Sequence, residues 1–331
     1  MSAADTHGAA VRALGRTALE VTVIGFGTAT AGNIWRARSD EEVAAGLAAA
    51  WDRGIRYFDT APHYGLGLSE QRVGKALQDR PRNEYILSTK VGRLLEPNLA
   101  PTGSDLTVGG FDVPDDLHRV RDYSADGVRR SLEASLDRLG VDRIDIVLVH
   151  DPDDYVGQAL TEAIPALVAL REQGVIGAVG VGMNQWQVPL RAVNETDVDV
   201  VMIAGRWTLA DRSAHPLLDR CAERGVAVLA AAPFNSGLLA RPRPAANATF
   251  DYGPAPRQML ERARALADVC DSAGISLPHA AMQFPLRHPA VASVVVGLSN
   301  GAQVNAAIER LQRPIEDEVW TRLDAVVERG Q

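Results

Sequence analysis

The stretch "SADGVRRSLEASLDRLGVDRIDIVLVH", residues 124–150, contains one complete structural unit followed by one chemically active side chain. Ser124 stands where a helix N-cap is expected, helical periodicity follows, and Gly140 stands where that helix should end. The apolar run at 144–149 then predicts a buried strand with His150 at its tip. A continuous apolar strand next to a helix is typical of a parallel sheet covered by helices.

Similar apolar, β-rich runs recur and predict eight strands, at 22–26, 55–58, 85–89, 144–149, 178–182, 198–203, 226–231 and 292–296. Helical stretches separate them, and the stretch from Ser39 has the same type of cap and glycine end. Eight such units favour a closed (β/α)₈ TIM barrel, which we predict as a single domain over residues 1–331. The alternative is an open doubly wound sheet, but "GFGTAT" (25–30) lacks the glycine pattern with which such sheets bind dinucleotides.

The composition predicts a protein that acts on a small-molecule substrate. The net charge is -8 and no run of Lys or Arg occurs, which disfavours nucleic acid and anionic membrane surfaces as partners. The first 18 residues lack a signal-peptide core and no run of 18 apolar residues occurs, so we expect a cytoplasmic protein, as a monomer or weak homo-oligomer. Cys221 and Cys270 stand in apolar helical contexts and are expected in the core.

Two connections are too long to be simple turns and are expected to cover the mouth of the barrel. They span residues 91–125, after the third strand, and 236–256, after the seventh, and both are rich in Gly, Pro and Asp. Both follow carboxyl ends of strands, where barrel enzymes carry their active sites. At the other end, "VRALGRTALEV" (11–21) predicts a hairpin with "GR" as its turn, which would close the bottom of the barrel.

Polar residues end three consecutive predicted strands: Asp59 the second, Lys90 the third and His150 the fourth. In a barrel these tips converge on one mouth. Lys90 and Lys75 are the only lysines among the 34 Lys and Arg residues, so Lys90 is expected to serve a purpose that arginine cannot. An ammonium group is a compact charge whose proton affinity responds to burial, whereas a guanidinium group stays protonated.

Tyr64 follows Asp59 closely and is expected in the loop above the same mouth. A phenol has a pKa of about 10, and contact with Lys90 should lower that pKa, while Asp59 would offset the desolvation of Lys90. His150 would then donate a hydrogen bond to a substrate oxygen. Each residue alone also has an ordinary explanation, such as a turn cap, a surface charge or a core aromatic ring. Their joint occurrence at successive strand tips favours a catalytic site.

The remaining histidines and nearby carboxylates predict structural roles and no metal site. His63 is expected to line the pocket or its turn, without a catalytic role. Asp151, Asp153 and Asp154 are expected to cap the helix that follows His150. The other histidines share no spacing typical of metal ligands. They are His7, His118, His215, His279 and His288.

Three motifs resemble the aldo-keto reductase superfamily: "FDTAPHYG" (58–65), "STKVGR" (88–93) and "VLVHDPDD" (147–154). With "GVGMNQ", "FNSGLL", "DYGPAP" and "AMQFPLRHPAVASVVVG", the resemblance covers nearly the whole chain. These segments are similar to the branch that contains L-fucose or D-threo-aldose 1-dehydrogenases and pyridoxal 4-dehydrogenase. The resemblance implies a catalytic tetrad of Asp59, Tyr64, Lys90 and His150, with Tyr64 as the group that transfers the proton.

The resemblance also implies a nicotinamide cofactor that lies extended across the barrel mouth, without a Rossmann domain. Matching segments are the "GT" after the first strand, the asparagine after the fifth, "PFNSGLL" after the seventh and "GLSN" after the eighth. The cofactor contacts that this implies are Gly27, Thr28, Asp59, Asn184, Pro233, Phe234, Asn235, Ser236, Gly237, Leu238, Gly297, Leu298, Ser299, Asn300 and Gln303.

The sequence departs from the family pattern at several cofactor positions. Ala204 replaces the usual glutamine after the sixth strand, and Ala231 replaces the aromatic residue that commonly stacks on the nicotinamide. Trp207, in "GRWTL", is a candidate replacement for that ring. Ala306 and Ala307 stand where a Glu-Asn pair often binds adenine, so adenosine binding should be looser or differently built.

The function that this resemblance implies is NAD(P)-dependent oxidation of an aldose at C1 to its lactone. The Asp- and Gly-rich loop 91–125 suits sugar hydroxyls, while the low aromatic content, 5%, disfavours the flat ring of pyridoxal. Pyridoxal 4-dehydrogenation and broad aldehyde or ketone reduction are the alternatives, and a cofactor-sensing module without turnover is disfavoured by the intact tetrad. NAD is expected over NADP, because residues 297–307 contain no cation for a 2′-phosphate. Arg241 or Arg243 would have to supply that charge if NADP were preferred.

Overall fold

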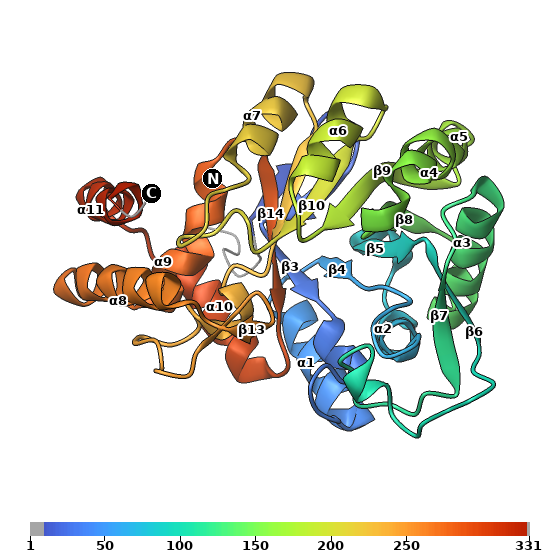
Figure 1. Ribbon diagram of the computed structural model, residues 1–331, viewed down its shortest axis with the longest axis horizontal. Coiled ribbons are helices and arrows are strands. Elements are labelled where there is room, and N and C mark those ends of the chain that lie inside the picture. Colours follow the sequence, from blue (N-terminus) through green and yellow to red (C-terminus); the bar gives the residue numbers. More distant parts are fainter. Residues whose placement is uncertain (1–9, 330–331) are drawn as a thin grey trace, which may run out of the picture.

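Eight parallel strands close into a barrel in the computed structural model, which describes residues 10–329 (Figure 1). Each barrel strand pairs with the next one along the chain, and the last pairs with the first. Closure leaves no barrel edge unpaired, which confirms the predicted TIM barrel and shows that the open sheet is wrong. The strands are β3 (Ile24–Gly27), β4 (Tyr57–Asp59), β5 (Ile86–Val91), β8 (Ile144–His150), β9 (Ile176–Met183), β10 (Val200–Ala204), β11 (Ala227–Ala231) and β14 (Val291–Gly297).

Helices surround the barrel and begin and end where the sequence predicts caps. The Ser39 and Ser124 hydroxyls accept hydrogen bonds from backbone N–H groups in the first turns of α1 and α3. Gly140 ends α3 in a left-handed conformation, with φ of 64°. The helices are α1 (Asp40–Asp52), α2 (Leu68–Leu77), α3 (Ala125–Leu139), α4 (Val156–Gln158), α5 (Ile164–Glu172), α6 (Gln187–Glu195), α7 (His215–Arg224), α8 (Arg257–Ser272), α9 (Leu277–Gln283), α10 (Gly301–Gln312) and α11 (Asp317–Glu328).

The predicted N-terminal hairpin is present and closes the amino-terminal end of the barrel. Strands β1 (Val11–Ala13) and β2 (Glu20–Thr22) pair antiparallel, and Gly15 in their turn has φ of 57°. The Arg16 N–H donates to the carbonyl of Gly225, just before β11, at 3.0 Å. Leu14 is fully buried among the side chains that fill the barrel interior. The hairpin therefore seals the end opposite the predicted active site.

Two apolar layers hold the barrel together. The inner layer fills the barrel with side chains such as Tyr57, Ile146 and Leu229. The outer layer is larger and joins the outward faces of the strands to the helices. Cys221 and Cys270 are fully buried, as predicted. Burial of this much apolar surface fixes the strand ends rigidly, which is what an active site at the mouth requires.

Both long connections pass over the carboxyl-terminal mouth, as expected. The first forms a two-stranded ribbon, β6 (Arg93–Pro97) and β7 (Leu117–Arg121), which lies beside α3 (Figure 1). The second contains the short pair β12 (Thr249–Phe250) and β13 (Gly253–Pro254). Phe111 of the first connection and Tyr252 of the second line the same cavity. The two loops therefore both contribute to the wall above the barrel.

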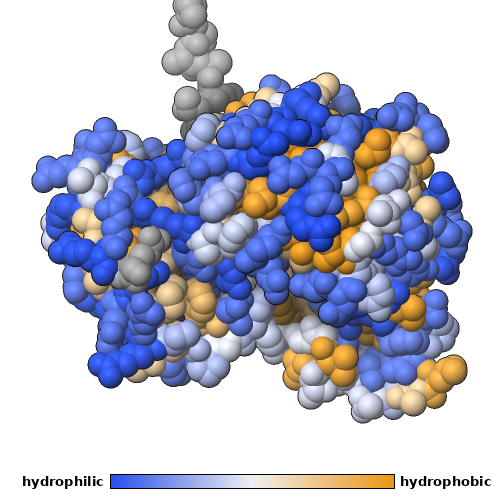
Figure 2. Space-filling view, turned by 45° about the horizontal axis from the view of Figure 1, so that its top comes forward, coloured by the Kyte–Doolittle hydropathy of each residue, from blue (hydrophilic) through white to orange (hydrophobic). Residues whose placement is uncertain are grey.

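The surface is largely hydrophilic on the face shown in Figure 2, with hydrophobic residues in small groups between polar ones. Several large hydrophobic residues are exposed in the first long connection, among them Leu99 and Val108. Within residues 10–329, none of the helices has both the length and the apolar composition that crossing a bilayer requires.

Candidate active site

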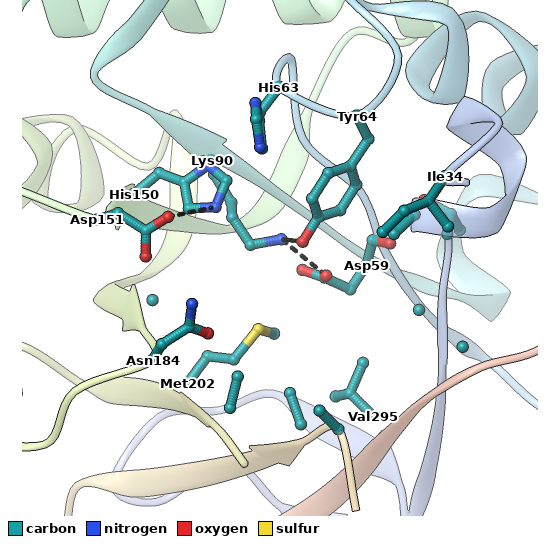
Figure 3. Close-up of a pocket in the computed structure, with 18 of the residues that line it drawn as sticks. Ile34, Asp59, His63, Tyr64, Lys90, His150, Asp151, Asn184, Met202 and Val295 are labelled. Atoms are coloured by element: carbon teal, nitrogen blue, oxygen red, sulfur yellow. Dashed lines mark hydrogen bonds and ion pairs between the residues drawn. The ribbon is translucent and has the colours of Figure 1, made fainter. Parts of the chain in front are cut away.

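A cavity of about 480 Å³ opens at the carboxyl-terminal mouth of the barrel. Its floor is formed by the tips of barrel strands, and the two long connections form its rim. Asp59, Tyr64, Lys90 and His150 all line it, so the structure brings the four predicted catalytic residues together (Figure 3). His63 lines it as well, in agreement with the sequence analysis.

The Lys90 ammonium group is buried at the centre of this cluster and uses all three of its hydrogens. It donates to Asp59 Oδ2 at 2.7 Å, to the carbonyl of Thr60 at 3.0 Å and to the Tyr64 hydroxyl at 3.1 Å. The second oxygen of Asp59 accepts from the Ser88 hydroxyl at 2.7 Å. Since the Tyr64 oxygen accepts from Lys90, its own hydrogen remains free for a group in the cavity. The cluster therefore leaves the hydrogen of the Tyr64 hydroxyl available to a molecule in the cavity.

Burial dominates the proton affinities in the cluster. Burial raises the pKa of Tyr64 to about 12, although Lys90 opposes this by favouring the phenolate. The expectation that Lys90 leaves Tyr64 with a lowered pKa is therefore wrong in its net direction, while the direction of the contribution from Lys90 is correct. Burial lowers the pKa of Lys90, but Asp59 and Tyr64 together raise it above its ordinary value. At neutral pH the cluster holds a charged ammonium beside a neutral phenol.

His150 lies next to Tyr64 and is neutral. Their ring centroids are 6.0 Å apart, and burial together with Arg93 lowers the pKa of His150 well below its ordinary value. A neutral imidazole carries one hydrogen, which it can donate to a substrate oxygen. His150 Nε2 lies 3.5 Å from a carboxylate oxygen of Asp151, whereas Nδ1 is buried without a partner among the described residues. The proton therefore belongs on Nε2.

Asp151, Asp153 and Asp154 do not cap the following helix as predicted. The short 3₁₀ turn at Asp153–Tyr155 and the helix α4 after it have no side-chain cap. The Asp151 carboxylate instead pairs with Arg93 at 2.5 Å inside the cavity wall, and Asp154 pairs with Arg121 on the surface. The sequence could not show this, because both arginines come from the β6–β7 ribbon, far away along the chain.

Part of the predicted cofactor set lines the cavity. Gly27, Thr28, Asn184 and Gly297 lie on its walls together with the catalytic residues. Ala204 and Ala231, the two alanines that replace larger family residues, lie on the same wall. Small residues here leave open space where larger side chains would project.

Residues 233–238, which were predicted to contact the cofactor, lie beside this cavity, and some of their side chains form hydrogen bonds within the protein. Asn235 accepts from the Thr208 hydroxyl at 2.6 Å and donates to the Gly205 carbonyl at 2.9 Å. Asn235 and Ser236 line a small hollow that shares Asn184 and Tyr252 with the main cavity. Pro233, Phe234, Gly237 and Leu238 line neither space.

The segment after β14 is organised as the start of a helix. The Asn300 side chain accepts from the Gln303 N–H at 3.0 Å, and the Gln303 side chain accepts from the Ser299 N–H at 2.8 Å. The Asn300 side chain thus caps α10, and Gln303 reaches back to the residue before the cap. Leu298 is buried, and these four residues lie outside the lining of the main cavity.

Trp207 does not reach the cavity, so the structure does not support it as the ring that stacks on a nicotinamide. It is buried, donates its indole N–H to the Pro285 carbonyl at 3.2 Å and stacks on His215 with ring centroids 5.6 Å apart. His215, Asp219 and His288 lie within 4.8 Å of one another, a proximity that their spacing did not indicate. Since His288 Nδ1 accepts from the Ala290 N–H at 3.2 Å, its Nε2 carries the hydrogen that faces Asp219. His288 and Asp219 therefore form a hydrogen bond.

The residues missed by sequence reasoning are those contributed by the loops. Trp35, Phe111 and Tyr252 bring aromatic rings to the cavity, and Arg93 and Asp151 bring a pair of opposite charges. A partial signal was available, because Arg93 and Asp151 belong to the motifs that contain Lys90 and His150. Tyr252 had such a signal too, because it lies in "DYGPAP", whereas Trp35 and Phe111 lie in none of the quoted motifs.

Comparison with known proteins is consistent with this geometry. Residues 23–328 match the Aldo/keto reductase family. The chain is 46% identical over 309 residues to a D-threo-aldose 1-dehydrogenase of a Pseudomonas species, covering 92% of this chain and 94% of that protein. It is 40% identical over 330 residues to the pyridoxal 4-dehydrogenase of Microbacterium luteolum, covering 94% of this chain and 96% of that protein. The holo form of aldo-keto reductase AKR11C1 from Bacillus halodurans superimposes with a TM-score of 0.75 at 26% identity, over 96% of this chain and 95% of that one.

Proposed function

The chain belongs to the aldo/keto reductase family and is an NAD(P)-dependent oxidoreductase, and we propose that it oxidises an aldose at C1 to the lactone. The observation that carries this proposal is the hydrogen bond from Lys90 to the Tyr64 hydroxyl, which leaves the phenol hydrogen directed at a cavity of about 480 Å³. The similarity to an aldose 1-dehydrogenase supports the substrate class.

Several features of the cavity support the proposal that it binds a nicotinamide. Its wall includes the small residues Gly27, Gly182, Ala204, Ala231 and Gly297, which leave room for a flat ring beside larger side chains such as Met202 and Val295. Asn184 on the same wall would bind the carboxamide. When bound, the oxidised nicotinamide accepts the hydride from C1 of the sugar.

The residues of the cluster would carry out the proton transfer. Tyr64 accepts the hydrogen of the C1 hydroxyl as the C1–O double bond forms, and Lys90 stabilises the phenolate that must exist before this transfer. His150 donates its Nε2 hydrogen to the same substrate oxygen and holds it beside Tyr64. In the reverse direction the neutral phenol gives its hydrogen to a carbonyl oxygen. The same residues therefore serve oxidation and reduction.

A second candidate is oxidation of pyridoxal, which one structural observation favours. Trp35, Phe111 and Tyr252 place aromatic rings at the cavity, and a flat heteroaromatic substrate could stack on them. The low aromatic content of the chain as a whole had argued against such a substrate. The 40% identical relative is a pyridoxal 4-dehydrogenase.

A substrate panel tests the proposal. Reduction of NAD⁺ and NADP⁺ would be measured with L-fucose, D-arabinose, L-galactose, pyridoxal and simple alcohols, and the lactone would be identified as the product. We expect kcat/KM to be highest for one of the aldoses. A much higher kcat/KM for pyridoxal would contradict the proposal in favour of the second candidate.

We further propose that NAD is preferred over NADP. Arg243, one of the two arginines that would have to supply a cation, is engaged by Asp268 and Asp271, which counts against its availability for a 2′-phosphate. Ser299 and Asn300 offer polar groups that suit a ribose hydroxyl. Ser299→Arg should raise kcat/KM for NADP⁺ by about 10- to 100-fold, since one charge-assisted hydrogen bond contributes about 1.5 to 3 kcal/mol. A preference of the unaltered enzyme for NADP⁺ would contradict this.

A further inference from the structure

An ion pair between Arg93 and Asp151 forms part of the cavity wall beside the catalytic histidine. The guanidinium and carboxylate groups are 2.5 Å apart, and their side chains are 11% and 22% exposed. The same carboxylate lies 3.5 Å from His150 Nε2, the nitrogen assigned to the substrate oxygen (Figure 3). The pair is therefore next to the histidine that we propose binds the substrate oxygen.

The backbone of Asp151 adopts an uncommon conformation, which places its carboxylate at the cavity. Asp151 has φ of 40°, in the left-handed region that disfavours residues with a side chain. The Tyr123 hydroxyl stabilises the turn by sharing its one hydrogen between the carbonyls of His150, at 2.6 Å, and Asp151, at 2.8 Å. The Asp151 N–H donates to the Gly182 carbonyl at 3.1 Å. Contacts on three sides therefore hold Asp151 at the cavity.

The local backbone geometry also restricts the position of Arg93. Gly92 before it has φ of 99°, and a Cβ atom there would lie 2.2 Å from the Tyr123 ring. Only glycine allows the chain to pass this close to the ring that supports Asp151. Tyr123 thus packs against the residue before Arg93 and hydrogen bonds to the Asp151 backbone.

We propose that Arg93 and Asp151 form the subsite that recognises the hydroxyl groups adjacent to the reacting carbon of a polyhydroxylated substrate. A sugar hydroxyl is both donor and acceptor, so it can accept from the guanidinium and donate to the carboxylate at once. A simple alcohol or a hemiacetal without further hydroxyls leaves the pair unused. This inference rests on the proposed function, because it assigns the substrate's neighbouring hydroxyls to a place in that site.

The proposal is tested first by binding, with a ligand that cannot react. The ligand 1,5-anhydro-L-fucitol keeps the ring hydroxyls of the sugar but has no hydroxyl at C1. Its dissociation constant for the enzyme saturated with NADH would be measured by calorimetry. Asp151→Asn should weaken binding about 10- to 100-fold, because a charge-assisted hydrogen bond is lost. Asparagine tolerates the left-handed conformation, so the turn is retained.

The matched control is the neighbouring surface pair. Arg121 and Asp154 come from the same ribbon and the same loop, lie 3.1 Å apart and are 39% and 80% exposed. Asp154→Asn should leave the dissociation constant unchanged. If the unaltered enzyme does not bind the analogue, or if Asp151→Asn binds it as tightly, the proposal is overturned.

A kinetic comparison separates recognition from positioning of His150. We would compare kcat/KM for L-fucose with kcat/KM for tetrahydropyran-2-ol, a hemiacetal without other hydroxyls. Asp151→Asn and Arg93→Met should lower the ratio of the two values at least about tenfold, while Arg121→Met keeps it. Equal losses on both substrates would show that the pair only orients the catalytic residues, which overturns the proposal.

The proposed function and the proposed hydroxyl subsite can be disproved independently of each other. If the enzyme oxidises no aldose, the proposed function is wrong. If the analogue nevertheless binds, and Asp151→Asn weakens its binding while Asp154→Asn does not, the assignment of the hydroxyl subsite is supported.

Discussion

At the scale of single residues, the site is organised around one lysine whose three hydrogens all have acceptors. Lys90 and Asp59 are almost completely buried, with side chains 2% and 3% exposed. Removing two opposite charges from water is costly, and only close pairing with further hydrogen bonds offsets that cost. The Thr60 carbonyl and the Ser88 hydroxyl provide those bonds. These contacts hold the Lys90 ammonium group within hydrogen-bonding distance of the Tyr64 oxygen.

The raised pKa of Tyr64 predicts different pH profiles for the two directions of reaction. Oxidation needs the phenolate, which is scarce below a pKa of about 12, so kcat/KM for oxidation should rise nearly tenfold per pH unit between about pH 7 and 10. Reduction needs the neutral phenol, which is already present, so its kcat/KM should stay flat over this range. Stopped-flow or steady-state rates in both directions would measure this. An oxidation profile that levels off near pH 7 would show that another group accepts the proton.

Lys90→Met should impair both catalysis and stability. The variant removes the cation that favours the phenolate, so the oxidation profile should shift further toward alkaline pH. It also leaves the buried Asp59 carboxylate without its partner, which should lower the free energy of unfolding by about 3 to 5 kcal/mol. The pKa of Lys90 is raised in the folded state, so this stabilisation is fully present below the unfolded pKa of about 10.4 and is lost as the pH rises through the folded value.

Urea unfolding at pH 7 and rate profiles would be compared with those of Lys75→Met, the variant of the only other lysine. Lys75 is exposed on α2. Its variant should behave like the unaltered enzyme in both measurements. Equal stability of the two variants would mean that Lys90 does not compensate the buried carboxylate.

At the scale of the elements, the position of the strand tips depends on how closely the surrounding helices approach one another. Helices α2 and α3 are in contact where Gly74 faces the end of α3. A Cβ atom at Gly74 would lie 2.1 Å from the Leu139 carbonyl oxygen, a backbone atom that cannot move aside freely. Since α2 follows the loop that carries Tyr64, this contact also affects the site.

Gly74→Ala should therefore destabilise the protein even though alanine favours helices. We expect a loss of about 1 to 3 kcal/mol from overpacking, measured by urea unfolding. Gly157→Ala in α4 is the matched control, because no atom of residues 10–329 beyond its own surroundings in the helix lies within 4 Å of the added atom. There the substitution should be neutral or slightly stabilising. A stabilised Gly74→Ala would contradict the close approach of the two helices.

At the scale of the whole molecule, the sequence predicts the barrel because periodicity and caps are local properties. The apolar run predicted at 144–149 is β8 (Ile144–His150), and the cap at Ser124 is present. The meeting of Asp59, Lys90 and His150 also follows, since closure of a barrel brings strand tips together. The barrel topology was therefore sufficient to predict that these three side chains meet.

What the sequence does not predict depends on contacts between distant segments. The pairing of Arg93 with Asp151 requires the path of the β6–β7 ribbon, and the position of Tyr252 requires that of the second loop. Trp207 was assigned to the mouth because it follows a strand, but its indole packs away from the cavity. The net pKa of Tyr64 depends on the extent of burial, which composition does not reveal.

The central claim is that Tyr64 transfers the proton within an otherwise intact binding site, and Tyr64→Phe tests it most directly. Both kcat/KM for aldose oxidation and the dissociation constant of NADH, from its fluorescence, would be measured in this variant and in the control Tyr155→Phe. The account predicts that Tyr64→Phe lowers kcat/KM by about 10²- to 10⁴-fold, since the general acid/base is lost, while NADH binding and the control are nearly unchanged. A Tyr64→Phe rate within about threefold of the unaltered enzyme would contradict it.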